Sequence, residues 1–158
     1  MTGIDPRVLR NAFGCFPTSV TVITTRPEDG TPRGFTANSF TSVSLEPPLL
    51  LVCLAHMAAS YKVFREADSF AVNVLAADQE ATALRFATRG ADKFGATSWH
   101  PGAHGAPLIE GCLARFDCLM HQRVVAGDHD ILMGRVIGFS RHAGEALLYH
   151  GGAFQRLG

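Results

Sequence analysis

The chain has 158 residues and a mass of 16.9 kDa, which is enough for one domain with a sizeable buried core. Its 14 Lys and Arg residues balance 14 Asp and Glu residues, so the formal net charge is zero. This balance argues against a nucleic-acid binder held by counterion release and against a polybasic membrane-surface protein. Only 18% of the residues are charged, and we therefore expect another chain to cover part of the surface.

We expect a cytoplasmic protein with reduced cysteines. No stretch reaches the roughly 18 apolar residues that a membrane span needs, and residues 1–10 lack the apolar region of a secretory signal. No two of the four cysteines form a CxxC pair; they are Cys15, Cys53, Cys112 and Cys118. Free thiols are therefore expected, and neither a disulfide nor a zinc site is.

The N-terminal part of the chain predicts a helix followed by a hairpin. Asp5 as the N-cap and Pro6 as the first helical residue begin a short amphipathic helix. Its apolar side chains are Val8, Leu9, Ala12 and Phe13. The β-branched segment Ser19–Thr25 predicts a strand, and the turn at Glu28-Asp29-Gly30 joins it to a second strand over Gly34–Ser44.

The middle of the chain alternates strands with short helices. Two prolines precede Leu49–Leu54, whose continuous apolar run indicates a strand that is buried on both faces. A short helix over Ser60–Ala67, with Ser60 as its N-cap, and a strand over Phe70–Leu75 follow. A second helix is expected over Asp78–Thr88, capped by Asp78, with an apolar side formed by Ala81, Leu84 and Phe86.

The last part of the chain predicts a long loop and three strands. Arg89–Gly111 is rich in Gly and Pro and is expected to be a loop. Two long strands, Leu113–Val125 and Asp130–Phe139, flank a turn at Gly127-Asp128, and Leu147–His150 is a final short strand. Seven strands with so few helices indicate a mainly β fold, a closed antiparallel barrel with peripheral helices, rather than a doubly wound α/β sheet.

Several enzyme classes are excluded by the motifs that the sequence lacks. There is no GxSxG nucleophile elbow, no GxxxxGK[ST] phosphate loop and no GxGxxG dinucleotide fingerprint. His100 and His104 flank Pro101-Gly102, so they cannot share one helical face. We interpret them as exposed loop histidines and expect no metal site.

A run of hydroxyl and amide side chains crosses the second predicted strand, and we call Thr36–Ser44 the hydroxyl-rich run. Strand alternation would put Thr36, Asn38, Phe40 and Ser42 on one face, and Ala37, Ser39, Thr41 and Val43 on the other. Such side chains can hydrogen-bond a polyol and a phosphate without adding charge. A polar strand exposed to water has the same composition, so the residues alone leave both interpretations open.

A histidine between two carboxylates stands at the turn before the last long strand. His129 lies between Asp128 and Asp130, and both carboxylates are expected to favour its protonated imidazole. His129 is either a functional group at the turn or a histidine that stabilises the turn itself.

In order and spacing, these segments resemble the flavin reductase-like family, the FMN-binding split barrels that serve as reductase components of two-component flavin monooxygenases. The resemblance covers about Asp5 to Phe154 and departs from the family pattern at Ser19 and Gly152. The segments that carry it are Phe16–Thr25, Gly34–Leu54, Ser60, Phe70–Leu75, Asp92-Lys93-Phe94, Gly127-Asp128-His129, Gly134-Arg135-Val136 and Leu147–Gly152.

The resemblance implies a single domain over residues 1–158, a Greek-key antiparallel split β-barrel with short peripheral helices, and a homodimer with flavin near the subunit interface. Ala37, Asn38, Ser39 and Thr41, with Thr36 beside them, would line the ribityl chain and phosphate. Cys53 and Leu54 would lie against the isoalloxazine, and Ser60 near the phosphate, with Arg89 or Lys93 supplying positive charge. His129, the catalytic candidate, and Tyr149 would face the nicotinamide.

The implied activity is hydride transfer from NADH or NADPH to FMN or FAD, which would supply reduced flavin to a partner oxygenase. In this mechanism the cofactors carry the chemistry and the protein aligns them, with His129 positioning the nicotinamide by a hydrogen bond. Two alternatives share the barrel: an enzyme like pyridoxamine-phosphate oxidase, or a non-catalytic module that binds flavin or haem. The former class usually has more Arg and Lys than this neutral chain.

Overall fold

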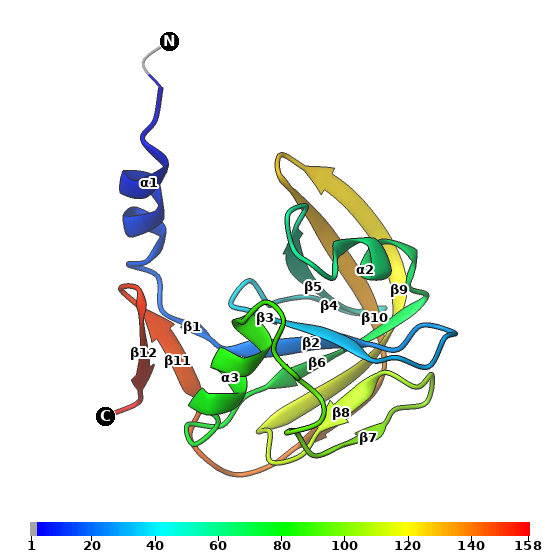
Figure 1. Ribbon diagram of the computed structural model, residues 1–158. Coiled ribbons are helices and arrows are strands. Elements are labelled where there is room, and N and C mark those ends of the chain that lie inside the picture. Colours follow the sequence, from blue (N-terminus) through cyan, green and yellow to red (C-terminus); the bar gives the residue numbers. More distant parts are fainter. Residues whose placement is uncertain (1–2) are drawn as a thin grey trace.

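The structure is a computed structural model that describes residues 3–158, and its elements surround one strongly curled sheet (Figure 1). The helices are α1 (Pro6–Phe13), α2 (Tyr61–Glu66) and α3 (Glu80–Ala87). The strands are β1 (Thr18–Ser19), β2 (Thr21–Thr25), β3 (Arg33–Ala37), β4 (Thr41–Leu45), β5 (Pro48–Ala55), β6 (Ser69–Val74), β7 (Trp99–Pro101), β8 (Pro107–Ile109), β9 (Ala114–Ala126), β10 (His129–Arg141), β11 (Leu147–His150) and β12 (Ala153–Arg156).

The main sheet has seven antiparallel strands in the order β3-β2-β6-β9-β10-β5-β4. Its two edge strands, β3 and β4, are consecutive in the chain, and within residues 3–158 they do not pair with each other. The sheet therefore curls into a barrel that is split between β3 and β4. This confirms the prediction of a mainly β, antiparallel split barrel. The strand count suggested a barrel closed by hydrogen bonds, and that prediction is wrong.

The prediction of one strand over Gly34–Ser44 is also wrong, because the chain bends at Asn38–Phe40 between β3 and β4. Phe40 packs against the core and stacks on Phe116 of β9, with ring centroids 5.7 Å apart. The Ser39 hydroxyl accepts a hydrogen bond from the backbone N–H of Cys53 at 2.8 Å. These anchors carry the chain from one edge of the sheet to the other, so the expected alternation of faces does not continue through Asn38–Phe40.

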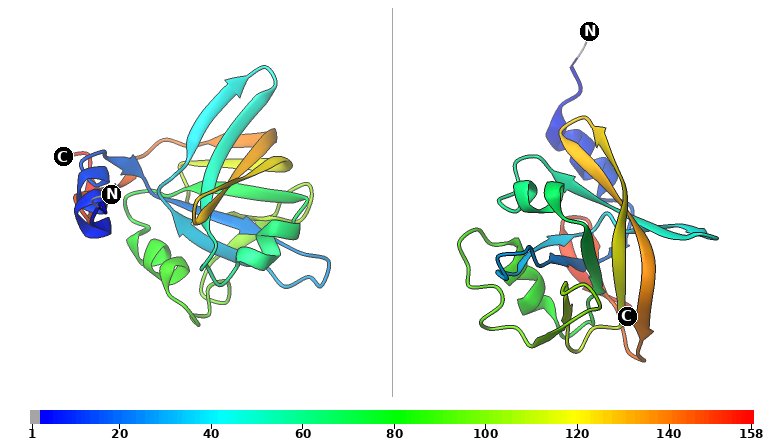
Figure 2. Two further views of the ribbon diagram at one scale, coloured as in Figure 1. Left: turned by 90° about the horizontal axis from the view of Figure 1, so that it is seen from above. Right: turned by 90° about the vertical axis from the view of Figure 1, so that its right-hand side faces the viewer.

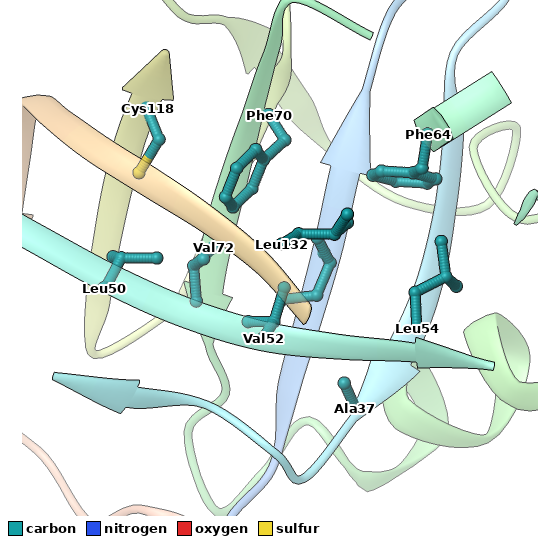
Figure 3. Close-up of a cluster of buried hydrophobic side chains, with 10 residues drawn as sticks. Ala37, Leu50, Val52, Leu54, Phe64, Phe70, Val72, Cys118 and Leu132 are labelled. Carbon is teal, nitrogen blue, oxygen red and sulfur yellow. The ribbon is translucent and has the colours of Figure 1, made fainter. Parts of the chain in front are cut away.

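The barrel interior is filled from the inward faces of the strands. Buried side chains from β3, β5, β6, β9, β10 and α2 meet in one cluster (Figure 3). In β5 only Leu50, Val52 and Leu54 point inward, while Leu49, Leu51 and Cys53 are half-buried on the outer face. The interpretation of Leu49–Leu54 as buried on both faces is therefore wrong, since an antiparallel strand can leave one face uncovered.

The predicted helices form with shifted ends. In α1 the Asp5 carboxylate accepts a hydrogen bond from the Arg7 N–H, as the N-cap prediction requires. In α3 the predicted cap is wrong: the helix begins at Glu80, and Gln79 instead joins Ala76 N–H to the Glu110 carbonyl. Its buried residues are Ala83 and Phe86, whereas Leu84 is 52% exposed.

Three short strands went unpredicted. β7 and β8 pair inside the segment expected to be a loop, and β12 pairs with β11. Together β1, β11 and β12 form a second sheet beside the barrel (Figure 2). The hairpins predicted around Glu28-Asp29-Gly30 and Gly127-Asp128 are confirmed as β2–β3 and β9–β10. Among the helices of residues 3–158, none is long and apolar enough to cross a membrane.

Two glycines of β10 give a matched test of the core. A Cβ added to Gly134 would lie 2.6 Å from the Phe70 ring and 2.9 Å from the Cys118 Cβ, whereas one added to Gly138 meets nothing within 4 Å. We expect Gly134→Ala to lower the free energy of unfolding by about 1–3 kcal/mol through overpacking. Gly138→Ala should change it by less than about 0.5 kcal/mol. Urea unfolding of both variants measures the difference, and equal effects would contradict this packing.

Candidate functional site

Two cavities lie along β3, on the part of the chain that the sequence predicts to bind flavin. The first has a volume of about 480 Å³ and mostly apolar walls. Strand β3 and the bend after it contribute Thr36, Ala37 and Asn38, and Tyr149 of β11 lies across from them. The other lining residues are Val20, Leu84, Ala87, Gly152, Ala153 and Phe154. The structure thus brings four of the predicted site residues together.

The second cavity, of about 440 Å³, lies at the beginning of β3 and contains the charged groups. Ser60 and Lys93 line it together with Arg33, and Ser60 is buried without a side-chain hydrogen bond that caps α2. Arg89 does not line this cavity; its guanidinium donates to the Met57 carbonyl at 2.5 Å. Of the two candidate cations, Lys93 is therefore the one beside Ser60. Arg33 was missed, although it stands directly before the Gly34 segment.

Helix α3 covers the face of β3 between these cavities. The Thr36 hydroxyl donates to the Ala83 carbonyl at 2.6 Å, so it already has a partner in the protein. Gly34 is buried against Phe86, and a Cβ there would lie 2.9 Å from that ring. A small residue at this position is what allows the helix to pack closely on the strand.

The remaining flavin candidates surround the bend. Ser39 is tied to the backbone of Cys53, and Thr41 is exposed at the start of β4. Cys53 is half-buried on the outer face of β5. Leu54 is 1% exposed and its side chain belongs to the core, so only its backbone is available to a ligand.

His129 occupies the first position of β10, directly after the β9–β10 turn. Its Nδ1 lies 2.7 Å from the Asp128 carboxylate, and its side chain is 45% exposed. The hydrogen bond with His129 holds the pKa of Asp128 below its usual value. His129 lines neither cavity, but its register partner on β5 is Ala55, two residues after Cys53. The bend borders the first cavity through Asn38 and is bonded through Ser39 to Cys53 of β5, two residues before the partner of His129.

The expectation that both carboxylates serve His129 is wrong, because Asp130 belongs to a different histidine. The buried carboxylate of Asp130 contacts His56 Nε2 at 2.7 Å and accepts a hydrogen bond from the Tyr61 hydroxyl at 3.0 Å. Burial opposes ionisation of Asp130, yet the bonds from His56 and Tyr61 outweigh it and keep the pKa of Asp130 below its usual value. Sequence reasoning missed this cluster, since its members are up to 74 residues apart.

A flavin needs an apolar slot for its ring system and hydrogen-bond donors with positive charge for its phosphate. The first cavity offers apolar walls with Asn38 at its edge, and the second offers Arg33, Lys93 and the Ser60 hydroxyl. The Asp92 carboxylate also lines the second cavity, and it accepts a hydrogen bond from the Gly95 N–H at 3.0 Å. These residues fit such a ligand. A cavity of about 580 Å³ elsewhere is lined by charged residues such as Glu110 and Arg115, and none of the predicted site residues lines it.

Acid unfolding tests the Asp130 cluster. A depressed folded-state pKa stabilises the fold above the unfolded-state pKa near 3.9, and this contribution is lost as pH falls through the folded-state value. We expect Asp130→Asn to lower the free energy of unfolding by about 1–3 kcal/mol near pH 6. The difference from wild type should shrink between about pH 5 and pH 3. Urea unfolding across this range measures it, and a difference that grows on acidification would contradict the assignment.

Comparisons with known proteins identify the family of this chain. The family model described as flavin reductase like domain matches residues 13–158. The stachydrine N-demethylase reductase subunit of Rhizobium meliloti (strain 1021) is 47% identical over 150 residues, which are 95% of this chain and 65% of that protein. The chain spans only 48% of the length of two further curated relatives. The NADH-dependent FAD reductase of Streptomyces globisporus is 44% identical over 98% of this chain and 88% of that protein.

A solved structure has the same fold. The NADH:FAD oxidoreductase of Streptomyces globisporus C-1027, in complex with NAD and FAD fragments, superposes with a TM-score of 0.92 and 45% identity, covering 100% of this chain and 98% of that one. The family model matches nearly the whole chain, and these relatives are 44–47% identical to it. The resemblance inferred from the motifs is therefore confirmed, and the chain belongs to the flavin reductase-like family.

Proposed function

We propose that this chain is an NAD(P)H:flavin oxidoreductase that supplies reduced FMN or FAD to a partner monooxygenase. The observation that carries the proposal is the match to an NADH-dependent FAD reductase over nearly the full length of both chains. A relative named as the reductase component of a trigonelline monooxygenase supports an oxygenase partner. These names favour the reductase over the two alternatives that share the barrel. A cytoplasmic location stays a prediction.

The protein's part in this activity is to bind and align. A bound flavin would supply the redox chemistry that the side chains lack, as acceptor of the hydride from the reduced nicotinamide. Asn38 hydrogen-bonds the ribityl chain, while Lys93, Arg33 and Ser60 hold the phosphate at the other end of β3. The apolar walls of the first cavity, including the Tyr149 ring, exclude water from the reacting rings.

His129 contacts the nicotinamide and fixes its orientation by a hydrogen bond. It is half-exposed at the tip of a hairpin, so a ligand can reach it, and Asp128 on Nδ1 leaves Nε2 free to point outward. The protein itself neither donates nor accepts the hydride. Loss of His129 therefore lowers the rate by misaligning the nicotinamide.

The activity is tested by NADH and NADPH consumption with FMN, FAD and riboflavin, each compared with a reaction that lacks flavin. We expect flavin-dependent consumption. Asn38→Ala should weaken flavin binding about two- to tenfold through one lost hydrogen bond, worth about 0.5–1.5 kcal/mol. Ser42→Ala, an exposed hydroxyl of the same run, is the matched control and should leave binding unchanged. Flavin binding without nicotinamide oxidation would point instead to a non-catalytic module.

We also propose a homodimer, in which a second copy covers helix α1. No residue of α1 is buried, and Val8 and Phe13 on its apolar side are 65% and 69% exposed. Figure 1 shows this helix extending away from the barrel. An apolar face of this kind on a free surface is unfavourable and typical of an interface.

Sedimentation equilibrium should therefore give about twice 16.9 kDa. The double variant Val8→Asp with Phe13→Asp should give the monomer mass, because it places charge on the face that the partner covers. Asn11→Asp, on the polar side of α1, should stay dimeric. A wild-type monomer would contradict the dimer, and a dimeric double variant would contradict the role of α1.

A further inference from the structure

His56, the first residue after β5, contacts both neighbours of His129. Its backbone N–H donates to the Asp128 carbonyl at 2.9 Å, and its Nε2 lies 2.7 Å from the Asp130 carboxylate. The residue between these two contacts is His129, whose own register partner is the preceding Ala55. One residue directly after β5 therefore holds the chain on each side of the proposed nicotinamide contact.

The contact between His56 and Asp130, which we call the clamp, is also bonded to α2. Asp130 is 3% exposed, and each of its carboxylate oxygens has a partner, His56 on Oδ1 and the Tyr61 hydroxyl on Oδ2. Tyr61 is the first residue of α2, and its ring lies 4.9 Å from the His56 imidazole. The cluster thus joins three elements: the end of β5, the beginning of α2 and the beginning of β10.

Backbone pairing with Ala126 of β9 and Ala55 of β5 holds His129, but the turn before it is exposed to solvent. Gly127 adopts a φ of +65°, and Val125 and Asp128 beside it are exposed. Side chains from the body of the domain further restrict an exposed hairpin tip of this kind. Catalytic alignment is sensitive to displacements of about 1 Å, so holding the tip has a direct effect on the rate.

We propose that His56, held by Asp130 and Tyr61, is a positioning residue that fixes the β9–β10 turn and thereby places His129 against the nicotinamide. This inference rests on the proposed function, in which His129 contacts NADH. It assigns a role to three residues that are buried or half-buried away from both cavities along β3.

A double-mutant cycle in kcat/KM for NADH tests the proposal. His56→Ala alone should lower kcat/KM about three- to thirtyfold, with the flavin Kd near wild type. In the His129→Ala background the same substitution should change kcat/KM by less than about twofold, because the residue it positions is already gone. A purely structural role would lower the folded fraction in both backgrounds and would leave the two effects independent.

Two further variants keep the result interpretable. Tyr61→Phe removes only the hydroxyl on the second oxygen of Asp130 and should give a smaller loss than His56→Ala, even if the latter folds poorly. His121→Ala, an exposed histidine of β9 with no side-chain hydrogen bond within residues 3–158, should leave kcat/KM unchanged. Equal losses from His56→Ala in the two backgrounds, or wild-type kinetics for both His56→Ala and Tyr61→Phe, would overturn the proposal. If His129→Ala itself has wild-type NADH kinetics, the proposed contact fails, and the positioning role fails with it.

Discussion

The bend at Asn38–Phe40 is the constraint on which the rest of the structure depends. A seven-stranded sheet that curls into a barrel must bring its first and last strands together, and here those strands are consecutive in the chain. Stacking of Phe40 on Phe116 and the hydrogen bond between Ser39 and the Cys53 N–H hold the bend against the barrel. These interactions join the bend to β9 and β5, since within residues 3–158 β3 and β4 do not pair with each other.

The candidate site follows from that bend. Helix α3 packs on one face of the edge strand β3 at Gly34. A cavity lies at each end of this contact between α3 and β3. The other edge strand, β4, pairs with β5, and the chain after β5 continues through His56 to α2. The bend therefore joins the cavity lined by Tyr149 to β5, whose last residue pairs with His129. A long, flat ligand with a charged end suits this arrangement better than a compact one.

Much of the fold could be predicted because strand and turn signals are local. The β-branched segment Ser19–Thr25 and the turn at Gly127-Asp128 identified two hairpins, and the motifs in family order identified the barrel. The bend could not be predicted, because the strand-like run continues through Asn38–Phe40 without a Gly or Pro to mark the break. Its cause is the packing of Phe40 on a strand that lies far along the chain.

Part of the site was predictable because some of its residues are close together in the sequence. Residues that share a short segment, such as Thr36, Ala37 and Asn38, were found together. The assignment of Asp130 to His129 was wrong, because neighbours in a strand point to opposite faces. The true partner, His56, comes from the turn after β5. Sequence spacing alone cannot supply a pairing of this kind until the strand register is known.

Hydrogen–deuterium exchange with and without FMN would test most directly the claim that flavin binds along β3 and the bend. The account predicts slower exchange of the amides of Thr36–Thr41 and of the Ser60 region when FMN is added, with little change at the charged cavity beside Glu110 and Arg115. Protection confined to that charged cavity, or no protection at Thr36–Thr41 at saturating FMN, would contradict it.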